Sequence, residues 1–175
     1  MVEGQSMDTP DHAVAAADSA RAMLRHTLAT LAYRAGKVVR DAPAAFADLL
    51  VAPATRTPVA ILSHMADLIE WGLSMAQGHS TWREDSPDSW DAEVERFFAA
   101  LTAFDQHLAG DVRIEPRWIG PLFQGPVADA LTHTGQLAML RRLAGSPVRG
   151  ENYARAEIII GNVSIVQPAP RLEFD

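Results

Sequence analysis

The chain has 175 residues, of which 48% are hydrophobic and 21% are charged, and its formal net charge is -7. This length is enough for one domain with a sizeable core, and the composition is ordinary for a globular protein. The negative charge and the lack of a lysine or arginine cluster disfavour nucleic acid and anionic membranes as partners. The absence of cysteine excludes disulfides, thiolate metal ligands and a cysteine nucleophile.

Targeting and membrane signals are also missing. No basic N-terminal stretch precedes an apolar run, and no apolar stretch reaches the roughly 18 residues that a membrane span requires. We therefore expect a cytoplasmic protein that does not cross a membrane. Residues 1–10 are polar and are expected to be disordered, whereas residues 11–175 are expected to form a single domain.

The first expected helix covers residues 11–39. Its apolar residues recur at spacings of four and three, which places them on one helical face, namely Leu24, Leu28, Leu31, Ala35 and Val38. The connector over 40–56 contains Pro43 and Pro53. Its apolar centre is expected to pack on the core as a short turn or helix.

The second expected helix begins after Thr57, a good N-cap residue, with Pro58 at the first helical position and Gly78 as the stop. His64 lies in the middle of its apolar face. A single inward histidine is usually a core residue with a hydrogen-bond partner, so His64 alone is weak evidence for a site. Asp67, at the edge of the same face, could orient it.

The third expected helix follows a polar loop over 79–89 and is capped by Asp88 or Ser89. It ends at Gly110. Its stripe of apolar and aromatic side chains is expected to be core, and comprises Trp90, Val94, Phe97, Leu101, Phe104 and Leu108. Asp105 lies near this stripe and is expected to be solvated.

The fourth expected helix runs from Pro126 to Gly145, after a loop over 111–124. Proline suits a first helical turn, and glycine suits the residue that ends a helix. Asp129 and His133 are four residues apart and therefore share a face, which also carries the apolar stripe. A carboxylate and an imidazole facing a core are costly unless they bind each other or a ligand.

The C-terminal tail over 146–175 has two interpretations. Residues 157–166 resemble a β-hairpin around Gly161 and Asn162. An isolated two-stranded ribbon is marginally stable, so an apolar tail packed across the helices is equally plausible.

Four amphipathic helices predict an all-α four-helix bundle, a fold that builds its sites from inward polar side chains on different helices. Here those side chains are His64, Asp129 and His133. Two imidazoles and one carboxylate make a three-ligand metal site with open positions, as in catalytic zinc and non-haem iron centres.

Two stretches resemble the DinB/YfiT-like superfamily of metal-dependent bundles. They are ILSHMADLIEW around His64 and DALTHTGQLAMLRR around His133, and the similarity continues into SPVRGENYARAEI. The resemblance implies an up-down-down-up four-helix bundle, a zinc or nickel ion held by three histidines, and a homodimer. It also implies, for some members, transfer of a low-molecular-weight thiol to an electrophile.

Asp129 departs from this pattern, because it stands where the family has its first histidine of the fourth helix. Aspartate is a competent zinc ligand, although its charge makes bound water less acidic than three neutral imidazoles would. The alternative is that the metal has been lost and that Asp129 only hydrogen-bonds His64 or His133.

Two functions follow from this. The first is a metal-dependent enzyme, a thiol S-transferase or a hydrolase, with a divalent zinc, nickel or iron ion, a small-molecule substrate and a low-molecular-weight thiol as co-substrate. The second is a non-catalytic dimeric or ligand-binding bundle, in which the histidines and the aspartate form a buried polar network without a metal.

Overall fold

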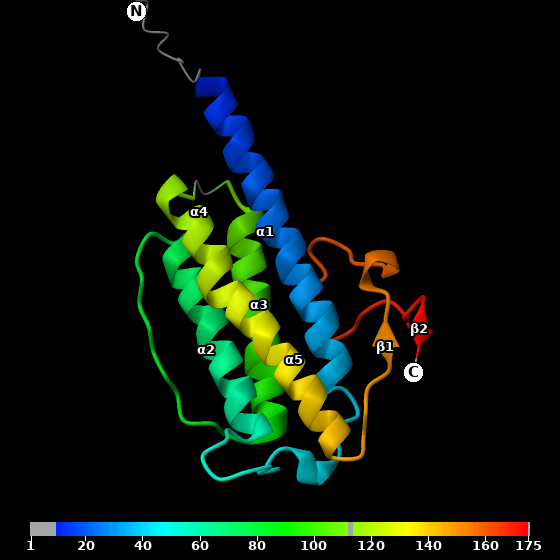
Figure 1. Cartoon of the computed structure of the whole chain (residues 1–175). Helices are drawn as coiled ribbons and strands as arrows, with labels where there is room; N and C mark the ends of the chain where they lie inside the picture. The colour runs from blue at the N-terminus through cyan, green and yellow to red at the C-terminus, as the bar shows by residue number, and fades with distance from the viewer. Residues whose placement is uncertain (1–9, 112–113, 175) are drawn as a thin grey trace, which may run out of the picture.

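The computed structural model describes residues 10–111 and 114–174, so the expected disorder of residues 1–10 concerns residues outside this range, Pro10 excepted. The fold is all-α, as predicted (Figure 1). The described α-helices are α1 (Pro10–Val39), α2 (Pro58–Ala76), α3 (Trp90–Ala109), α4 (Pro116–Leu122) and α5 (Ala128–Leu143). None of them is both long and apolar enough to cross a membrane.

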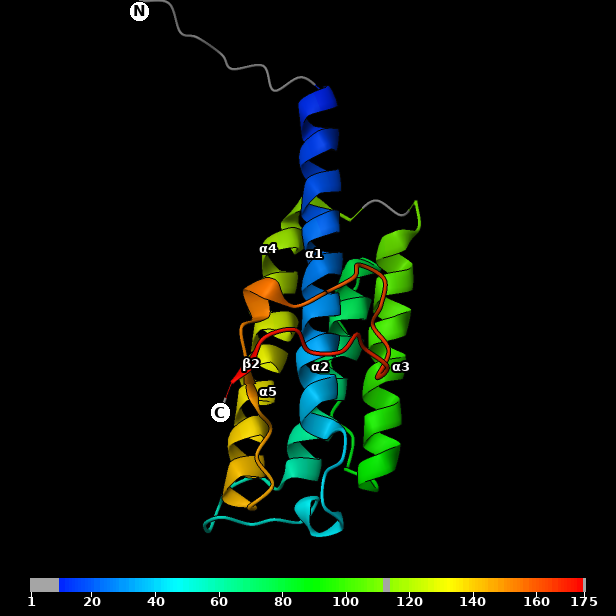
Figure 2. The ribbon, with the colours of Figure 1, turned by 90° about the vertical axis from the view of Figure 1, so that its right-hand side faces the viewer.

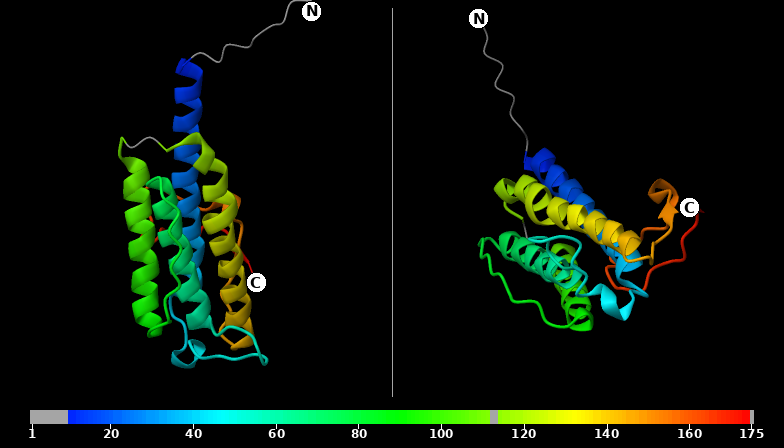
Figure 3. Two further views of the ribbon diagram at one scale, coloured as in Figure 1. Left: turned by 90° about the vertical axis from the view of Figure 1, so that its left-hand side faces the viewer. Right: turned by 60° about the horizontal axis from the view of Figure 1, so that its bottom comes forward.

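The long helices pack side by side around one hydrophobic core (Figure 3). Helix α2 contacts α3 and α5, and α1 contacts the same two helices from the other side. The apolar stripes predicted for the first and third helices are buried or packed against this core. Each long helix contributes a fully buried side chain, for example Leu28, Leu62, Leu101 and Leu137.

The starts predicted for the second and third helices are confirmed. The Thr57 side chain accepts a hydrogen bond from the Ala60 N–H, and the Ser89 side chain accepts one from the Ala92 N–H. These caps satisfy backbone donors that have no partner within the first helical turn. The expected turn in the 40–56 connector is a 3₁₀-helix, η1 (Ala44–Phe46), which buries Phe46.

Residues 77–89 form a long connection along the outside of the molecule. In Figure 1 this loop leaves α2 near one end of the helices and reaches the start of α3 near the other. Helices α2 and α3 therefore run in the same direction, although they are consecutive in the chain and pack against each other.

The fourth helical segment begins earlier than predicted. Residues 116–122 form α4 rather than a loop, and α4 continues through a π-helical turn, η2 (Phe123–Val127), directly into α5. Pro116, not Pro126, occupies the first helical position. The Ala128 N–H points to the carbonyl of Phe123 five residues back, which is the π pattern. This wider turn accommodates Pro126, which has no N–H and would crowd the carbonyl four residues before it.

The π turn rests directly on α2. A Cβ atom added to Gly72 of α2 would lie 2.9 Å from the Phe104 ring and 3.2 Å from Pro126. A glycine here therefore allows the start of α5 to approach α2 closely, which brings the inward faces of the two helices together.

The C-terminal tail packs across α1 and α3 rather than forming a hairpin at 157–166 (Figure 2). Val163 belongs to the core and Ile165 packs against it. Strands β1 (Gly150–Glu151) and β2 (Glu173–Phe174) pair antiparallel and join the two ends of the tail. The hairpin interpretation is wrong because the apolar side chains of the tail pack against the helices instead of against each other.

Buried ion pairs connect the helices and the tail. The Asp105 carboxylate of α3 accepts hydrogen bonds of 2.9 and 3.0 Å from the Arg25 guanidinium of α1, and its buried position corrects the expectation that it is solvated. The Glu151 carboxylate of β1 accepts hydrogen bonds from the Tyr33 hydroxyl and the Lys37 ammonium of α1. Both pairings neutralise a carboxylate that burial would otherwise penalise.

Candidate metal centre

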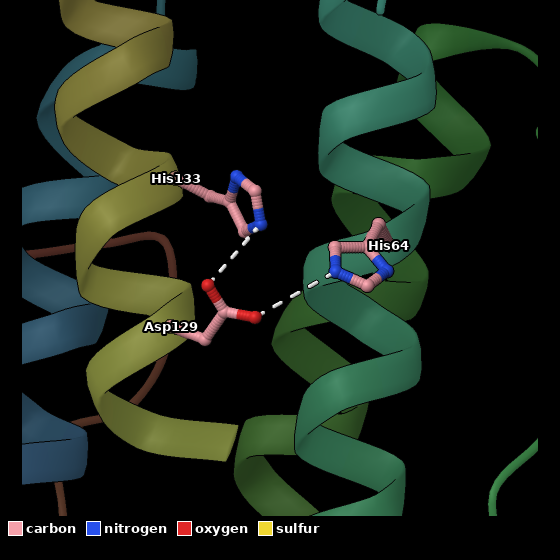
Figure 4. Close-up of side chains that lie close together, drawn as sticks. All are labelled: His64, Asp129 and His133. Atoms are coloured by element: carbon pink, nitrogen blue, oxygen red, sulfur yellow. Dashed lines mark ion pairs between the residues drawn. The ribbon is translucent and has the colours of Figure 1, made fainter. Parts of the chain in front are cut away.

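His64 of α2 and Asp129 and His133 of α5 lie together where these two helices face each other (Figure 4). The His64 Nε2 atom is 3.8 Å from Asp129 Oδ2, and the His133 Nε2 atom is 3.5 Å from Asp129 Oδ1. The two imidazole rings meet edge to face with their centroids 4.9 Å apart. The structure thus brings together all three residues that the sequence singled out.

The histidine–aspartate distances are longer than direct hydrogen bonds. Nitrogen–oxygen hydrogen bonds have lengths of about 2.7–3.2 Å, and neither histidine–aspartate contact is that short. Ligands about 2.1 Å from a tetrahedral zinc ion stand roughly 3.4 Å from one another. One ligand atom from each residue lies within 4.8 Å of the other two, a spacing at which the group could hold a metal ion.

A hydrogen bond to Gln136, on the next turn of α5, orients His133. The His133 Nδ1 atom is 2.7 Å from Gln136 Oε1. The amide oxygen can only accept, so Nδ1 carries the proton and donates it. The lone pair of the neutral ring is then on Nε2, the atom that faces Asp129. Histidines that bind metals commonly have such a partner on their second nitrogen.

His64 is held by packing rather than by a hydrogen bond. Among the described residues its buried Nδ1 atom has no partner, and its ring meets Trp82 edge to face at 5.7 Å. Burial lowers the pKa of His64, and the positive charge of Arg56 acts in the same direction. The ring is therefore neutral at pH 7, which is the form that binds a metal.

Asp67 does not orient His64, contrary to the expectation from sequence. Its carboxylate accepts a 2.9 Å hydrogen bond from Arg96 of α3. Asp67 also forms a second acidic group with Glu70 and Asp85, close enough together to hold a cation. The Arg96 guanidinium already occupies this place, with Nη1 within 2.9 to 3.6 Å of all three carboxylates.

The two imidazoles are mostly covered, whereas the carboxylate is accessible. The exposed fractions are 17% for the His64 side chain, 12% for His133 and 47% for Asp129. A cavity of about 560 Å³ borders the site and is lined partly by His133 and Gln136. Small molecules can therefore approach the group from the α5 side.

Two residues near the site were not singled out from sequence. Trp82 lies in the polar 79–89 loop and contacts both His64 and Trp71 by ring edges, and Arg56 lies just before α2. Neither has a periodic pattern that would predict an inward position. Their proximity arises only when the loops fold back over α2.

Comparison of the chain with known protein families, curated proteins and solved structures gave no match. The resemblance to the DinB/YfiT-like superfamily therefore stays a prediction from the motifs around His64 and His133.

Proposed function

We propose that this protein is a metal-dependent enzyme that holds a divalent transition metal ion with His64, Asp129 and His133. The observation that carries the proposal is that one ligand atom from each of these three residues lies within 4.8 Å of the other two. The nitrogen–oxygen distances of 3.8 Å from His64 and 3.5 Å from His133 to Asp129 are longer than hydrogen bonds of about 2.7–3.2 Å.

The fold that we propose for this enzyme is a DinB-like four-helix bundle with up-down-down-up topology. Its support is the parallel course of α2 and α3, which the 77–89 crossover connects (Figure 1). In such a bundle the second and fourth helical segments are neighbours. The contact between α2 and α5 agrees with this arrangement and brings the proposed ligands together.

The donor set favours zinc or nickel, with iron as a further candidate. Two neutral imidazoles and one carboxylate are borderline ligands, and three protein ligands leave open positions for a substrate. An ion bound there acts as a Lewis acid and lowers the pKa of a small thiol or of water. Zinc is the first metal to test.

The roles of the protein's own residues follow from their contacts. Gln136 fixes the proton of His133 on Nδ1, so that Nε2 is free to bind. Burial lowers the pKa of His64 and so favours its neutral ring, and Trp82 packs edge to face against that ring. The Asp129 carboxylate adds a negative charge on the accessible side.

The reaction that we propose is transfer of a low-molecular-weight thiol to a small electrophile, with hydrolysis as the second possibility. The chain contains no cysteine, so a thiol nucleophile has to come from a co-substrate. A small-molecule substrate is consistent with the size of the cavity beside His133.

The test is metal analysis of protein purified without an affinity tag. We expect close to one equivalent of transition metal per chain, or an increase in melting temperature on adding zinc or nickel. His133→Ala should abolish both, whereas His26→Ala, which removes an exposed histidine of α1, should change neither.

Metal below about 0.1 equivalent with no thermal stabilisation by zinc or nickel would refute the enzyme proposal. It would instead support the alternative, a non-catalytic bundle with a polar network. Unchanged occupancy in His133→Ala would refute the ligand assignment.

A further inference from the structure

The cavity beside the candidate metal centre has a mostly apolar wall. It lies between the segment before α2 and the outer face of α5, and it is lined by Val51, Thr55, Arg56, Ile61, His133, Gln136, Met139, Leu140 and Leu143. Met139 and Leu143 are large side chains that are more than half exposed. Its volume of about 560 Å³ is in the range of small-molecule sites.

Arg56 is the one permanent charge in this lining. It makes no hydrogen bond or ion pair with any residue in the part of the chain that the structure describes, whereas Arg96 and Arg141 are each fully engaged. A guanidinium at the edge of an apolar hollow is a ready partner for a carboxylate, which it can bind through two parallel hydrogen bonds.

Arg56 and His133 line the same cavity, so the cavity connects this arginine with the candidate metal centre. An anionic group bound at Arg56 would therefore share the cavity with His133, with the apolar remainder of the molecule along α5. A single guanidinium neutralises one negative charge, and its planar fork pairs with the two oxygens of a carboxylate.

We propose that this cavity binds a small organic carboxylate with an apolar body, whose carboxylate pairs with Arg56 and whose body lies along Met139 and Leu143. The proposal rests on the proposed function in taking the cavity as the substrate side of the metal centre. The net charge of -7 disfavours non-specific anion binding, so any affinity for a carboxylate needs a local cause.

Three probes test this by titration calorimetry, namely octanoate, its neutral analogue octanamide, and acetate, which has the carboxylate but no apolar body. Each is titrated into zinc-loaded and into chelator-treated protein. We expect octanoate to bind both forms, and octanamide and acetate to bind at least about tenfold more weakly, since a charged hydrogen-bonded pair contributes about that much.

Two variants locate the site. Arg56→Gln should weaken octanoate binding about tenfold or more, whereas Arg142→Gln, which removes an exposed arginine from α5 outside the cavity, should change it less than about twofold. Met139→Glu places a negative charge on the exposed apolar wall and should abolish octanoate binding without unfolding the protein.

Equal octanoate affinity in Arg56→Gln and in the unchanged protein would overturn the proposal, as would equal affinity for octanoate and octanamide. Metal content measured on the same preparations separates the two proposals. Bound zinc without octanoate binding overturns only the carboxylate site. Arg56-dependent octanoate binding in protein that takes up no metal overturns only the enzyme proposal.

Discussion

The Arg96 side chain of α3 forms hydrogen bonds with Ser63 and Asp67 of α2, which flank His64 in the sequence. Its removal should be among the single changes that lower the stability of the fold most. Its guanidinium donates to the Asp67 carboxylate at 2.9 Å, to Glu93 at 2.9 Å and to the Ser63 carbonyl at 2.8 Å. Burial opposes the charged form, but the hydrogen bonds to Asp67 and Glu93 outweigh this effect and raise the pKa of Arg96.

Arg96→Met keeps an unbranched apolar stem but leaves two buried carboxylates without their cation. The Asp67 side chain is 2% exposed and that of Glu93 is 4% exposed. Removing one partner of a buried pair costs about 3–5 kcal/mol. We expect about 3 kcal/mol, since Arg96 itself is partly exposed. For a chain of this size that loss lowers the melting temperature by roughly 6–12 °C.

Thermal unfolding followed by circular dichroism measures this loss, with Arg117→Met as the matched control. Arg117 pairs with Glu115 at 2.8 Å, but both side chains are more than half exposed, so its loss should cost less than about 1 kcal/mol. Adding Asp67→Asn to Arg96→Met should recover part of the stability. A decrease for Arg96→Met no larger than that for Arg117→Met would refute this reasoning.

Three further predictions concern the site and the tail. Asp129→Ala should abolish zinc retention, whereas Asp129→His should preserve it because imidazole is an equally competent zinc ligand. Elemental analysis of the purified variants checks both expectations. Zinc retained by Asp129→Ala would contradict the assignment of Asp129 as a ligand. Because burial lowers the pKa of His64 from 6.5, the unfolded chain binds that proton more tightly. The melting temperature of chelator-treated protein should therefore fall as the pH drops below about 6.5. His64→Leu should reduce this dependence of melting temperature on pH. The same dependence in His64→Leu and in the unchanged protein would contradict the prediction. Glu151→Ala removes the hydrogen-bond acceptor of Tyr33 and Lys37 and should lower the free energy of unfolding, measured by urea titration, by about 2–3 kcal/mol. A decrease as small as that of a surface substitution would show that these hydrogen bonds do not hold the tail.

Local signals were sufficient to predict most of the helices. Thr57 with Pro58, and Ser89 before an apolar stripe, give helix starts that depend on only a few neighbouring residues. The spacing of Asp129 and His133 placed both on one face, and the apolar neighbours of His64 indicated that it points inward. The meeting of these residues then required only that α2 and α5 be neighbours.

The predictions were wrong where contacts between residues far apart in the sequence determine how a side chain or segment is placed. Asp67 was expected to turn towards His64, but Arg96, on another helix, binds it more strongly than a neutral imidazole could. Asp105 was expected in solvent because nothing near it in sequence indicates Arg25. Residues 111–124 were expected to form a loop, although Pro116 begins a helix and the chain stays helical past Pro121.

The π turn before α5 has a consequence for the rotational phase of the candidate ligands. Such a turn holds one residue more than the same span of regular helix, and each residue turns a helix by about 100°. If the turn were straightened at constant chain length, Asp129 and His133 would rotate by about that angle, away from His64. A chain with one residue fewer between Pro121 and Ala128 would instead run as an uninterrupted helix and present the same face. The bulge thus absorbs an extra residue in the backbone while the inward side of α5 keeps its direction.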